Sequence, residues 1–392
     1  KKIRMGKIYT ALGLMSGTSM DGVDASIIKS DGADKFFSFF NEYSKFDKDL
    51  HEKLINLRDK ISTKADLKKY SAELKVLDRE LTIFHIKIIN KISEKYERST
   101  GENVDLIGFH GQTIFHDSKN KITKQLGDGK LLSQLTKKQV VYDFRQNDLK
   151  NGGQGAPLTP IFHNNIANKI NKKFNIGFPI NFLNIGGIAN VTSIIEKKNL
   201  WDTGKIYAYD ISPGNCLIDE WIRNNSKKKY DNEGSIARSG KRDELIFNQA
   251  LENFIIDPHY EKSLDTKDFD IFFAKGLSLE NGATTITDYT AKLISDGMNY
   301  VHCNDKTSMH RWLVCGGGRK NKYLLESIKK SQNNFTDLKL DLIEKYEIDG
   351  DFIESQAFAY LAIRSYEGMP ISFPTTTRCK KPSTGGIIVK NF

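Results

Sequence analysis

The chain has 392 residues, of which 39% are hydrophobic and 28% are charged, a composition that excludes a disordered protein and, at this length, predicts about two domains. The net charge of +10 arises from lysines and arginines that are interleaved with 49 acidic residues. A solvated basic surface is therefore favoured over a stripe that binds nucleic acid.

Cysteine spacing and hydropathy indicate the compartment. The four cysteines lie far apart without a Cys-x-x-Cys pair, which argues against a zinc module or a disulfide framework and favours reducing conditions. No apolar run reaches the roughly 18 residues that span a bilayer, and the first residues hold no apolar stretch of signal length. We therefore expect a cytoplasmic protein with neither a membrane nor a nucleic-acid partner.

Two strands joined by a tight turn are predicted at the start of the chain. Residues 7–17 form an apolar run that ends in glycine. Residues 23–32 alternate apolar and polar side chains and stop at Asp31-Gly32, a hairpin signal.

Two helical stretches follow, over residues 48–61 and 65–96. The second carries apolar residues at alternating spacings of three and four, which form one stripe: Leu67, Tyr70, Leu74, Leu77, Leu81, Phe84 and Ile88. Such a stripe is typical of a core or subunit contact. Residues 104–116 then predict a buried strand that runs into a turn, and residues 137–144 predict a further short strand.

The middle of the chain repeats the opening pattern. Glycines and prolines in residues 151–160 mark a break in organisation, and residues 178–196 then read as a strand, a glycine turn at Gly186-Gly187 and a second strand. This repetition suggests internal duplication. A helix is predicted at residues 216–225, and the last third alternates helices and strands, at residues 287–301, 311–321, 322–330 and 351–368. The sequence thus predicts an α/β protein with ligands at the carboxyl ends of strands.

A hydroxyl-rich loop between the first two strands is the first candidate site. Its residues are Ser16, Gly17, Thr18, Ser19, Met20, Asp21, Gly22, Val23 and Asp24. Glycine lets backbone amides approach a phosphate, and hydroxyls add donors. A carboxylate beside a phosphate commonly holds Mg²⁺ through oxygen or water, and Asp21 and Asp24 supply carboxylates. Taken alone, the same residues are equally typical of a hairpin turn without a ligand.

Two later motifs carry candidate chemistry. The glycines Gly316, Gly317 and Gly318 lie between a strand and a helix, where they fit either a nucleotide or a tight turn; their order gives no NAD fingerprint. Asp210 ends a strand, where it fits a turn or cap residue or a general base for phosphoryl transfer. His110 and His163 stand among apolar residues, so a structural or substrate-contact role is favoured.

Nine segments together carry a resemblance to a family. They are GLMSGTSMDGVDA, GFHGQT, DFRQND, GGQGAPLTPIFH, LNIGGIANVT, YDISPGN, KYDNEG, VCGGG and IESQAFAYLA. In order and approximate spacing the chain resembles the anhydro-N-acetylmuramic acid kinases from Gly13 to about Ile388. The resemblance implies the fold of the sugar kinase, Hsp70 and actin superfamily: α/β, with two RNase H-like domains and an ATP cleft between them. The implied domains are residues 1–142 plus 375–392, and residues 143–374.

The resemblance also implies the parts of the site. Residues 17–24 and Gly186-Gly187 would form two phosphate loops, Gly316 to Gly318 would lie toward the nucleoside, and Asp21 would hold Mg²⁺ through water. Asp210 matches the catalytic base, and the positions lining the sugar pocket match Thr113, Arg145 and Glu354.

The implied reaction uses Mg-ATP and a sugar. Asp210 would deprotonate a water that opens the 1,6-anhydro bridge, and the freed O6 would take the γ-phosphate to give N-acetylmuramic acid 6-phosphate. This is a step of peptidoglycan recycling. Members of the family are cytoplasmic and commonly dimeric, so the resemblance implies a homodimer.

Three segments depart from the family pattern. Asp210-Ile211-Ser212-Pro213-Gly214-Asn215 replaces Asp-Thr-Gly-Pro-Gly-Asn, Gln146-Asn147-Asp148 replaces Arg-Arg-Asp, and Lys262-Ser263-Leu264-Asp265 replaces Lys-Ser-Thr-Gly. The two missing arginines bear on the choice of sugar. The alternatives are a kinase for another anhydrosugar such as levoglucosan, and an ATPase module of the actin or chaperone kind without sugar chemistry.

Overall fold

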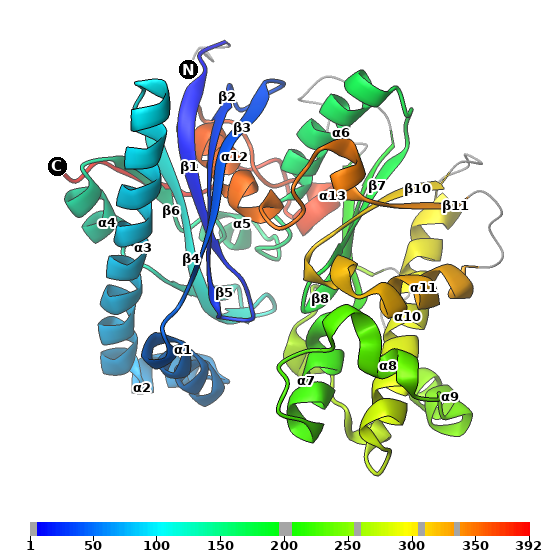
Figure 1. The fold of residues 1–392 in the computed structure, drawn as a ribbon. Coiled ribbons are helices and arrows are strands. Elements are labelled where there is room, and N and C mark those ends of the chain that lie inside the picture. The colour runs from blue at the N-terminus through cyan, green and yellow to red at the C-terminus, as the bar shows by residue number, and fades with distance from the viewer. Residues whose placement is uncertain (1–5, 196–205, 255–259, 305–309, 333–337) are drawn as a thin grey trace. The chain divides into compact units, whose positions relative to one another are not determined.

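The computed structural model describes residues 6–195, 206–254, 260–304, 310–332 and 338–392. The described residues pack as two compact units. Unit 1 contains residues 6–169 and 352–392, and unit 2 contains residues 170–195 and the described residues from 206 to 351 (Figure 1). Within these ranges, no helix combines the length and the apolar character that crossing a membrane requires.

Unit 1 is built on a seven-stranded sheet. Its strands are β1 (Tyr9–Ser16), β2 (Gly22–Ser30), β3 (Phe36–Lys45), β4 (Leu106–Asp117), β5 (Ile122–Leu126), β6 (Gln139–Tyr142) and β12 (Ile387–Val389). The order is β12-β6-β4-β1-β2-β3, and β5 pairs with β4. Strands β1, β2 and β3 form an antiparallel meander, whereas β4 runs parallel to β1 and β6. The predicted opening hairpin is confirmed, with Gly32 at φ 72° in the turn after β2.

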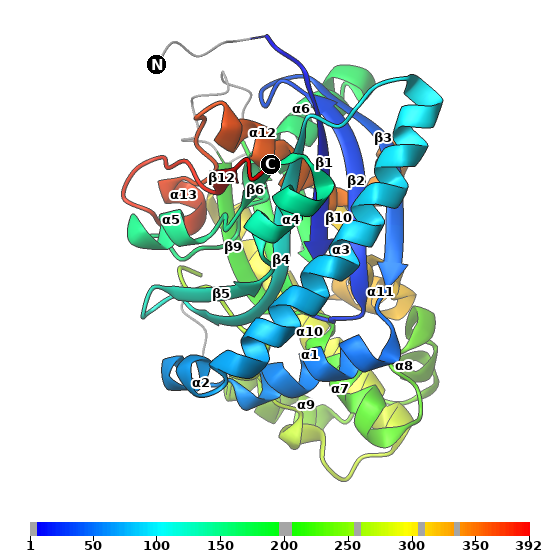
Figure 2. The same cartoon turned by 90° about the vertical axis from the view of Figure 1, so that its left-hand side faces the viewer.

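Helices α3 and α12 pack on this sheet. The helices of unit 1 are α1 (Lys48–Lys60), α2 (Lys64–Lys69), α3 (Ser71–Thr100), α4 (Gly129–Thr136), α5 (Gln146–Lys150), α12 (Ile353–Tyr366), α13 (Pro374–Thr377) and the greater part of α6 (Pro160–Phe174). Helix α3 contacts β2, β3 and β5 and runs diagonally across its face of the sheet (Figure 2). The predicted apolar stripe is core, because its members Leu74, Leu77, Leu81 and Ile88 are buried.

Two predicted elements differ from the structure. The helix expected over residues 65–96 is two helices, because Tyr70 lies outside helical geometry, at φ −98° and ψ 21°, between α2 and α3. The strand expected to run into a turn continues as β4 to Asp117. Gly111 takes φ 71° within it, and a Cβ at this position would lie 2.0 Å from the Leu126 carbonyl oxygen.

Helix α12 lies directly on the sheet because two neighbouring strand positions are glycines. Gly13 of β1 and Gly108 of β4 are register partners. A Cβ at Gly13 would lie 1.9 Å from Ser355 O, and one at Gly108 would lie 2.2 Å from Phe358 O. Any larger residue at either position would therefore push the helix off the sheet.

Unit 2 contains a five-stranded sheet with the order β11-β10-β7-β8-β9. Its strands are β7 (Ile180–Ile185), β8 (Ile188–Ile194), β9 (Ile206–Pro213), β10 (His310–Cys315) and β11 (Leu338–Leu342). The main helices are α7 (Asn215–Asn225), α8 (Ser235–Ser239), α9 (Glu244–Glu252), α10 (Leu279–Asn304) and α11 (Lys322–Ser331). Helix α10 is central, since it packs against β9 and all four of the other helices.

The two sheets share one topology. In unit 1 the series is β3-β2-β1-β4-β6, and in unit 2 it is β9-β8-β7-β10-β11. Each series contains a three-stranded antiparallel meander, followed by two parallel strands. The first strand of the meander, β1 or β7, pairs in parallel with β4 or β10, and that strand pairs in parallel with β6 or β11. This RNase H-like arrangement confirms the expected α/β fold class, and it supports the internal duplication suggested by the repeated strand-turn-strand pattern.

The compact units divide the chain at positions other than the expected domain boundaries. Residues 143–169 and 352–374 pack in unit 1 rather than with unit 2. The reason is an aromatic core: the rings of Phe144 and Phe358 lie 5.3 Å apart, and those of Phe162 and Tyr360 lie 5.4 Å apart. These contacts join distant parts of the chain, so glycine and proline punctuation does not reveal them.

Candidate functional site

The first glycine loop is a hairpin turn with exposed hydroxyls at its tip. The amide of Met20 donates to Gly17 O at 3.2 Å, and Met20 takes φ 53°. The Met20 side chain is buried, whereas Thr18 and Ser19 are exposed. A hairpin turn and a phosphate-binding loop are therefore compatible interpretations of this segment, because the turn exposes the hydroxyl donors of Thr18 and Ser19.

A buried glutamine fixes the start of this loop. Gln112 Oε1 accepts a hydrogen bond from Ser16 Oγ, and Gln112 Nε2 donates to Gly17 O at 3.0 Å. Ser16 Oγ also lies 2.9 Å from Gly22 O on the far side of the turn. Because both side chains are buried, strand β4 and both ends of the loop are held together. The sequence motif GFHGQT contained this glutamine, but its partner was not predicted.

Two carboxylates give the loop a negative field. Asp21 is exposed, and its Oδ1 accepts from Ser19 Oγ at 2.8 Å. Asp24 lies opposite Tyr43 in the β2–β3 register. Burial, with the charges of Asp21 and Asp24 adding to it, raises the pKa of Tyr43 to about 12.

The donor set of the loop fits Mg²⁺ that is carried by a nucleotide. Carboxylate and hydroxyl oxygens are the ligands that Mg²⁺ prefers, and the ion commonly keeps waters and substrate phosphates as further ligands. Over the residues that the structure describes, no three His, Cys, Asp or Glu side chains gather as an all-protein metal site.

In unit 2, the turn Gly186-Gly187 packs against the start of α7. The amide of Asn215 donates to Gly186 O at 2.7 Å, and that of Gly214 donates to Gly187 O at 2.8 Å. A Cβ at Gly214 would lie 2.3 Å from Gly186 O, so only glycine allows this approach. The YDISPGN segment therefore provides the platform on which the glycine turn rests.

The structure brings the triple glycine to the same place. A Cβ at Gly316 would lie 2.7 Å from Ile185 O, the residue just before Gly186. A Cβ at Gly318 would lie 3.1 Å from Asn215 Nδ2. Both predicted glycine loops of unit 2 thus meet at the end of β7 and the start of α7.

Arg319 locks the triple-glycine turn, a role that sequence reasoning missed. The Arg319 side chain is 5% exposed and donates to Glu344 Oε1 at 2.6 Å and to Asp351 Oδ1 at 2.9 Å. It also donates to Gly316 O at 3.0 Å. The two carboxylates compensate its buried charge, and the bond to Gly316 O fixes the turn.

Asp210 is half-buried on β9 and receives two hydrogen bonds at one oxygen. Ser263 Oγ donates to Asp210 Oδ2 at 3.0 Å, and the Leu264 amide donates to the same atom at 2.9 Å. Donors of this kind stabilise the charged carboxylate and fix its orientation. Ser263 and Leu264 belong to Lys262-Ser263-Leu264-Asp265, which stands in place of Lys-Ser-Thr-Gly. Ser263 occurs in both patterns, and its hydroxyl is the side-chain donor to Asp210.

In unit 1, the charge of Arg145 acts on the carboxyl group of Glu354. Burial raises the pKa of Glu354, and the charge of Arg145 opposes this shift. Glu354 belongs to the first turn of α12, and Arg145 immediately precedes α5. The guanidinium Nη1 donates to Gly155 O at 2.8 Å, and Nε donates to His110 Nε2 at 3.2 Å.

Thr113 is placed on β4, where its described partner comes from β5. Gln125 Nε2 donates to Thr113 Oγ1 at 3.2 Å and to Thr123 Oγ1 at 2.7 Å. Thr113 is therefore part of a polar row along the β4–β5 hairpin. Its backbone carbonyl accepts from Gln112, which also holds the first glycine loop.

Asp148 supports Arg145 through the backbone. Its buried carboxylate accepts from the Gly155 amide at 2.7 Å and from Thr377 Oγ1 at 2.6 Å. The Gly155 carbonyl is the acceptor for Arg145. Within Gln146-Asn147-Asp148, Asp148 is therefore the residue that holds the backbone acceptor of Arg145.

His163 fits the structural role favoured for it. It is 2% exposed on α6, and burial lowers its pKa to about 3. The imidazole is thus neutral at physiological pH and sits in the core of unit 1.

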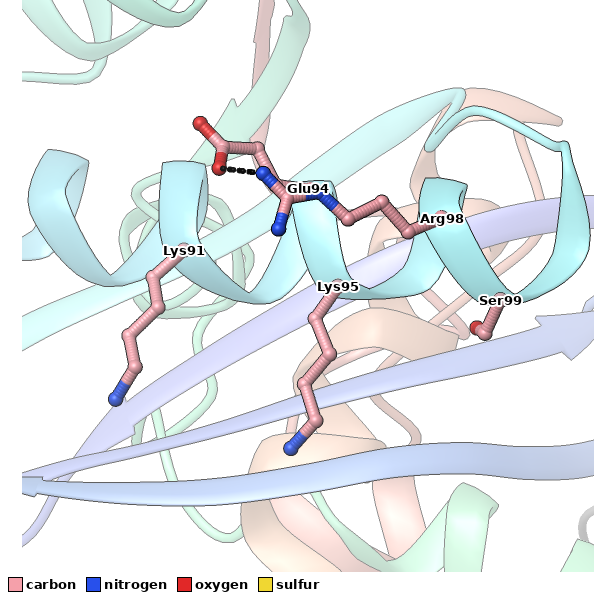
Figure 3. A pocket seen from close by; sticks show the side chains of 5 residues that line it. All are labelled: Lys91, Glu94, Lys95, Arg98 and Ser99. Carbon is pink, nitrogen blue, oxygen red and sulfur yellow. Dashed lines mark ion pairs between the residues drawn. The ribbon is translucent and has the colours of Figure 1, made fainter.

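A surface hollow lies apart from all of these residues. It has a volume of about 410 Å³ and is lined by Lys91, Glu94, Lys95, Arg98 and Ser99 of α3. Figure 3 shows Lys91 and Lys95 extending in the same direction while Arg98 pairs with Glu94. All five side chains are exposed and come from one helix, so the hollow is a solvated helix face with none of the predicted site residues.

Comparison with known proteins agrees with the motifs. The family model for anhydro-N-acetylmuramic acid kinase matches residues 9–391. A protein of that name from Pelagibacter ubique (strain HTCC1062) is 50% identical over 389 residues, which are 99% of this chain and 100% of that protein. One of the same name from Agrobacterium fabrum (strain C58 / ATCC 33970) is 35% identical over 389 residues, covering 98% of this chain and 100% of that protein.

Among solved structures, the likeness is weak. The activator of the 2-hydroxyisocaproyl-CoA dehydratase from Clostridium difficile with bound ADPNP is 11% identical with a TM-score of 0.41, over 90% of this chain and 94% of that chain. The sequence comparisons decide the family, since they extend over nearly every residue. The chain belongs to the anhydro-N-acetylmuramic acid kinase family.

Proposed function

We propose that this chain, a member of a family of ATP-dependent sugar kinases, opens the anhydro bridge of 1,6-anhydro-N-acetylmuramic acid with water and phosphorylates O6. The product is N-acetylmuramic acid 6-phosphate, formed in peptidoglycan recycling. The observation that carries the proposal is Asp210, held at Oδ2 by Ser263 and the Leu264 amide.

Asp210 acts as the general base. Its two hydrogen-bond donors hold Oδ2 and fix the orientation of the carboxylate that takes the proton. A water loses its proton to Asp210 as its oxygen bonds to C1 of the sugar. The bond from C1 to the bridging oxygen breaks, and this oxygen becomes O6.

Phosphoryl transfer completes the reaction. O6 bonds to the γ-phosphorus of ATP, the bond from that phosphorus to the β,γ-bridging oxygen breaks, and ADP leaves. Catalysis of this step depends mainly on positioning and charge stabilisation.

The glycine loops are assigned to ATP. In unit 1 the loop offers the hydroxyls of Thr18 and Ser19, and in unit 2 Gly186-Gly187 and Gly316 to Gly318 offer backbone without side chains. Closely approaching amides and hydroxyls are suited to phosphate oxygens. Mg²⁺ would be held by Asp21 through water and would neutralise charge on the phosphates when bound.

Thr113, Arg145 and Glu354 are assigned to the sugar. The guanidinium of Arg145 offers donors, and the carboxyl group of Glu354 offers acceptors, to hydroxyl, amide or carboxylate groups of a sugar. Burial raises the pKa of Glu354, with Arg145 opposing the shift, so the protonation of this group depends on its neighbour. The hydroxyl of Thr113 adds one further donor and acceptor.

We also propose a cytoplasmic homodimer, which family resemblance supports. Light scattering coupled to size-exclusion chromatography tests the assembly, and fractionation of cells tests the compartment. A monomeric mass across the working concentration range would contradict the dimer.

The experiment that tests the function measures ADP release from Mg-ATP with 1,6-anhydro-N-acetylmuramic acid, with levoglucosan and without sugar. We expect release only with the muramic sugar, and a loss of at least about 10³-fold in kcat for Asp210→Asn. Asp59→Asn, an exposed change in α1, is the matched control and should retain activity. Release with levoglucosan alone would assign another substrate, and sugar-independent release would favour a non-kinase ATPase.

A further inference from the structure

His110 is not among the residues assigned to chemistry, yet it contacts Arg145, one of the residues assigned to the sugar. It is 4% exposed on β4, and Nε2 lies 3.2 Å from Arg145 Nε and 3.0 Å from Arg145 Nη2. Two nitrogens of the guanidinium therefore donate to one imidazole nitrogen. This is the fork geometry of arginine directed at a single acceptor.

The chemistry of arginine fixes the tautomer. A guanidinium has five N–H donors and no acceptor, so His110 Nε2 must accept and carries no proton. The proton is then on Nδ1, which donates to Gly111 O at 2.7 Å. Burial first, and the charge of Arg145 second, lower the pKa of His110 to about 3, in agreement with a neutral ring.

The ring is also held against the helix that carries Glu354. The rings of His110 and Phe358 lie 4.5 Å apart, and those of Phe358 and Phe144 lie 5.3 Å apart. Phe358 follows Glu354 by four residues in α12, so both lie on one face of the helix. Arg145 follows Phe144 directly, and its Nη1 is bound by Gly155 O.

We infer that His110 is a positioning residue that holds the guanidinium of Arg145 in the orientation that receives the sugar. The inference rests on the proposed function for its kinetic consequence. The hydrogen bonds themselves are independent of which sugar is bound, and this separates the two claims experimentally.

The rival role for His110 is purely structural, through Nδ1 and the bend at Gly111. Two substitutions separate the roles because each amide replaces one ring nitrogen. The glutamine side chain of His110→Gln reaches the position of Nε2 and supplies an acceptor for Arg145. The shorter side chain of His110→Asn reaches the position of Nδ1, where it can donate to Gly111 O, but it supplies no acceptor for Arg145.

The kinetic test compares these two variants with the unaltered enzyme. We expect His110→Gln to keep a KM for the sugar within about 3-fold, and His110→Asn to raise it about 10-fold or more, with the KM for ATP unchanged in both. The reverse order would assign His110 to the Gly111 bend and overturn the inference. Equal effects of the two variants would also overturn it.

A second measurement needs no substrate. Phenylglyoxal modifies arginines, and peptide mass mapping follows the rate at Arg145 alone. Arg145 should react several-fold faster in His110→Asn than in His110→Gln, because it loses an acceptor that restrains two of its nitrogens. Equal rates of modification at Arg145 in the two variants would contradict the inference, whichever sugar the enzyme uses. A faster rate in His110→Asn, together with no activity on the muramic sugar, would support the inference and contradict only the proposed function.

A double-mutant cycle covers the case in which His110→Asn is poorly folded, as judged by thermal melting. If His110 acts through Arg145, then His110→Ala, which removes the acceptor, should raise the KM for the sugar about 10-fold in the unaltered enzyme but by less than about 2-fold in Arg145→Lys. Effects that add fully would show that the two residues act independently and would overturn the inference.

Discussion

Gln112 is hydrogen-bonded through its Oε1 to the hydroxyl of Ser16, so a side chain of β4 fixes the end of β1 from which the first glycine loop departs. Gln112 Nε2 donates to the next carbonyl, Gly17 O, at 3.0 Å. One amide thus satisfies both a donor and an acceptor of the loop, and it also contacts the carbonyl of Thr113. The loop assigned to phosphate is therefore held by the strand that carries a residue assigned to the sugar.

Replacing Gln112 by glutamate should weaken ATP binding. The new carboxylate would keep an acceptor for Ser16 but would set a negative oxygen against Gly17 O in a buried position, which costs about 2–4 kcal/mol of stability. We expect Gln112→Glu to raise the KM for ATP by about 10-fold while the KM for the sugar changes less. Gln249→Glu, an exposed change on α9, is the control. A larger effect on the sugar than on ATP would contradict the assignment of the loop.

Removing the hydroxyl that holds Asp210 should slow turnover. Ser263→Ala removes one of two donors to Asp210 Oδ2, and the loss of a hydrogen bond to a charged group costs about 1.5–3 kcal/mol. We therefore expect kcat to fall by about 10-fold or more, with the KM for ATP little changed. Ser263→Thr keeps the hydroxyl and should recover most of the rate. If alanine and threonine behave alike, Ser263 does not act through Asp210.

Two glycines of the opening motif should respond oppositely to alanine. A Cβ at Gly13 would lie 1.9 Å from Ser355 O, whereas nothing lies within 4 Å of a Cβ at Gly17. Gly13→Ala should therefore lower the free energy of unfolding by about 3 kcal/mol or more, and Gly17→Ala by less than about 1 kcal/mol. Urea denaturation of both variants measures this. Equal destabilisation would show that α12 does not rest on Gly13.

Stability should fall on acidification below about pH 6.5. Burial lowers the pKa of His85 to about 4, and burial is also the main cause that lowers the pKa of His110 and of His163 to about 3. In the unfolded chain a histidine takes up a proton near pH 6.5, so the unfolded state binds more protons than the folded state between about pH 6.5 and pH 4. Each histidine then costs up to about 1.4 kcal/mol per pH unit in this window, and none costs stability above it.

Asp219 should increase the stability of the folded protein on acidification, which is opposite to the effect of the histidines. Burial raises its pKa to about 7, so between its ordinary value and about 7 the folded state holds a proton that the unfolded state has lost. Its contribution therefore grows as the pH falls through 7 and offsets that of one histidine. Urea denaturation at pH 7.5, 6.5 and 5.5 measures the net slope.

His85→Leu isolates one histidine in this balance. The substitution should make the loss of stability on acidification shallower by up to about 1.4 kcal/mol per pH unit below pH 6. An unchanged slope would show that His85 is protonated in the folded protein.

The sequence predicted the features that depend on local pattern. The strand-turn-strand units at Gly17 and at Gly186-Gly187 are present, and the helix predicted over residues 216–225 is α7. Alternation and helical periodicity report burial directly, so these elements are accessible without a structure.

Contacts between distant segments were not accessible. Nothing local links Ser263 to Asp210, or Arg319 to Glu344 and Asp351, because the partners lie 25 or more residues apart in the sequence and meet only in the folded chain. The break between α2 and α3 at Tyr70 was not predicted for another reason. The apolar stripe continues through Tyr70, although Thr63 and Asp66 cap a separate short helix. Periodicity indicates which residues face the core but not where the backbone leaves the helix.

The most direct test of the account is the mass of the sugar product formed from 1,6-anhydro-N-acetylmuramic acid and Mg-ATP, with Asp210→Asn in parallel. We expect a product heavier than the substrate by one phosphoryl group and one water, formed by the unaltered enzyme and lost in the variant. A product heavier by the phosphoryl group alone, or undiminished formation by Asp210→Asn, would contradict hydrolytic opening with Asp210 as the base.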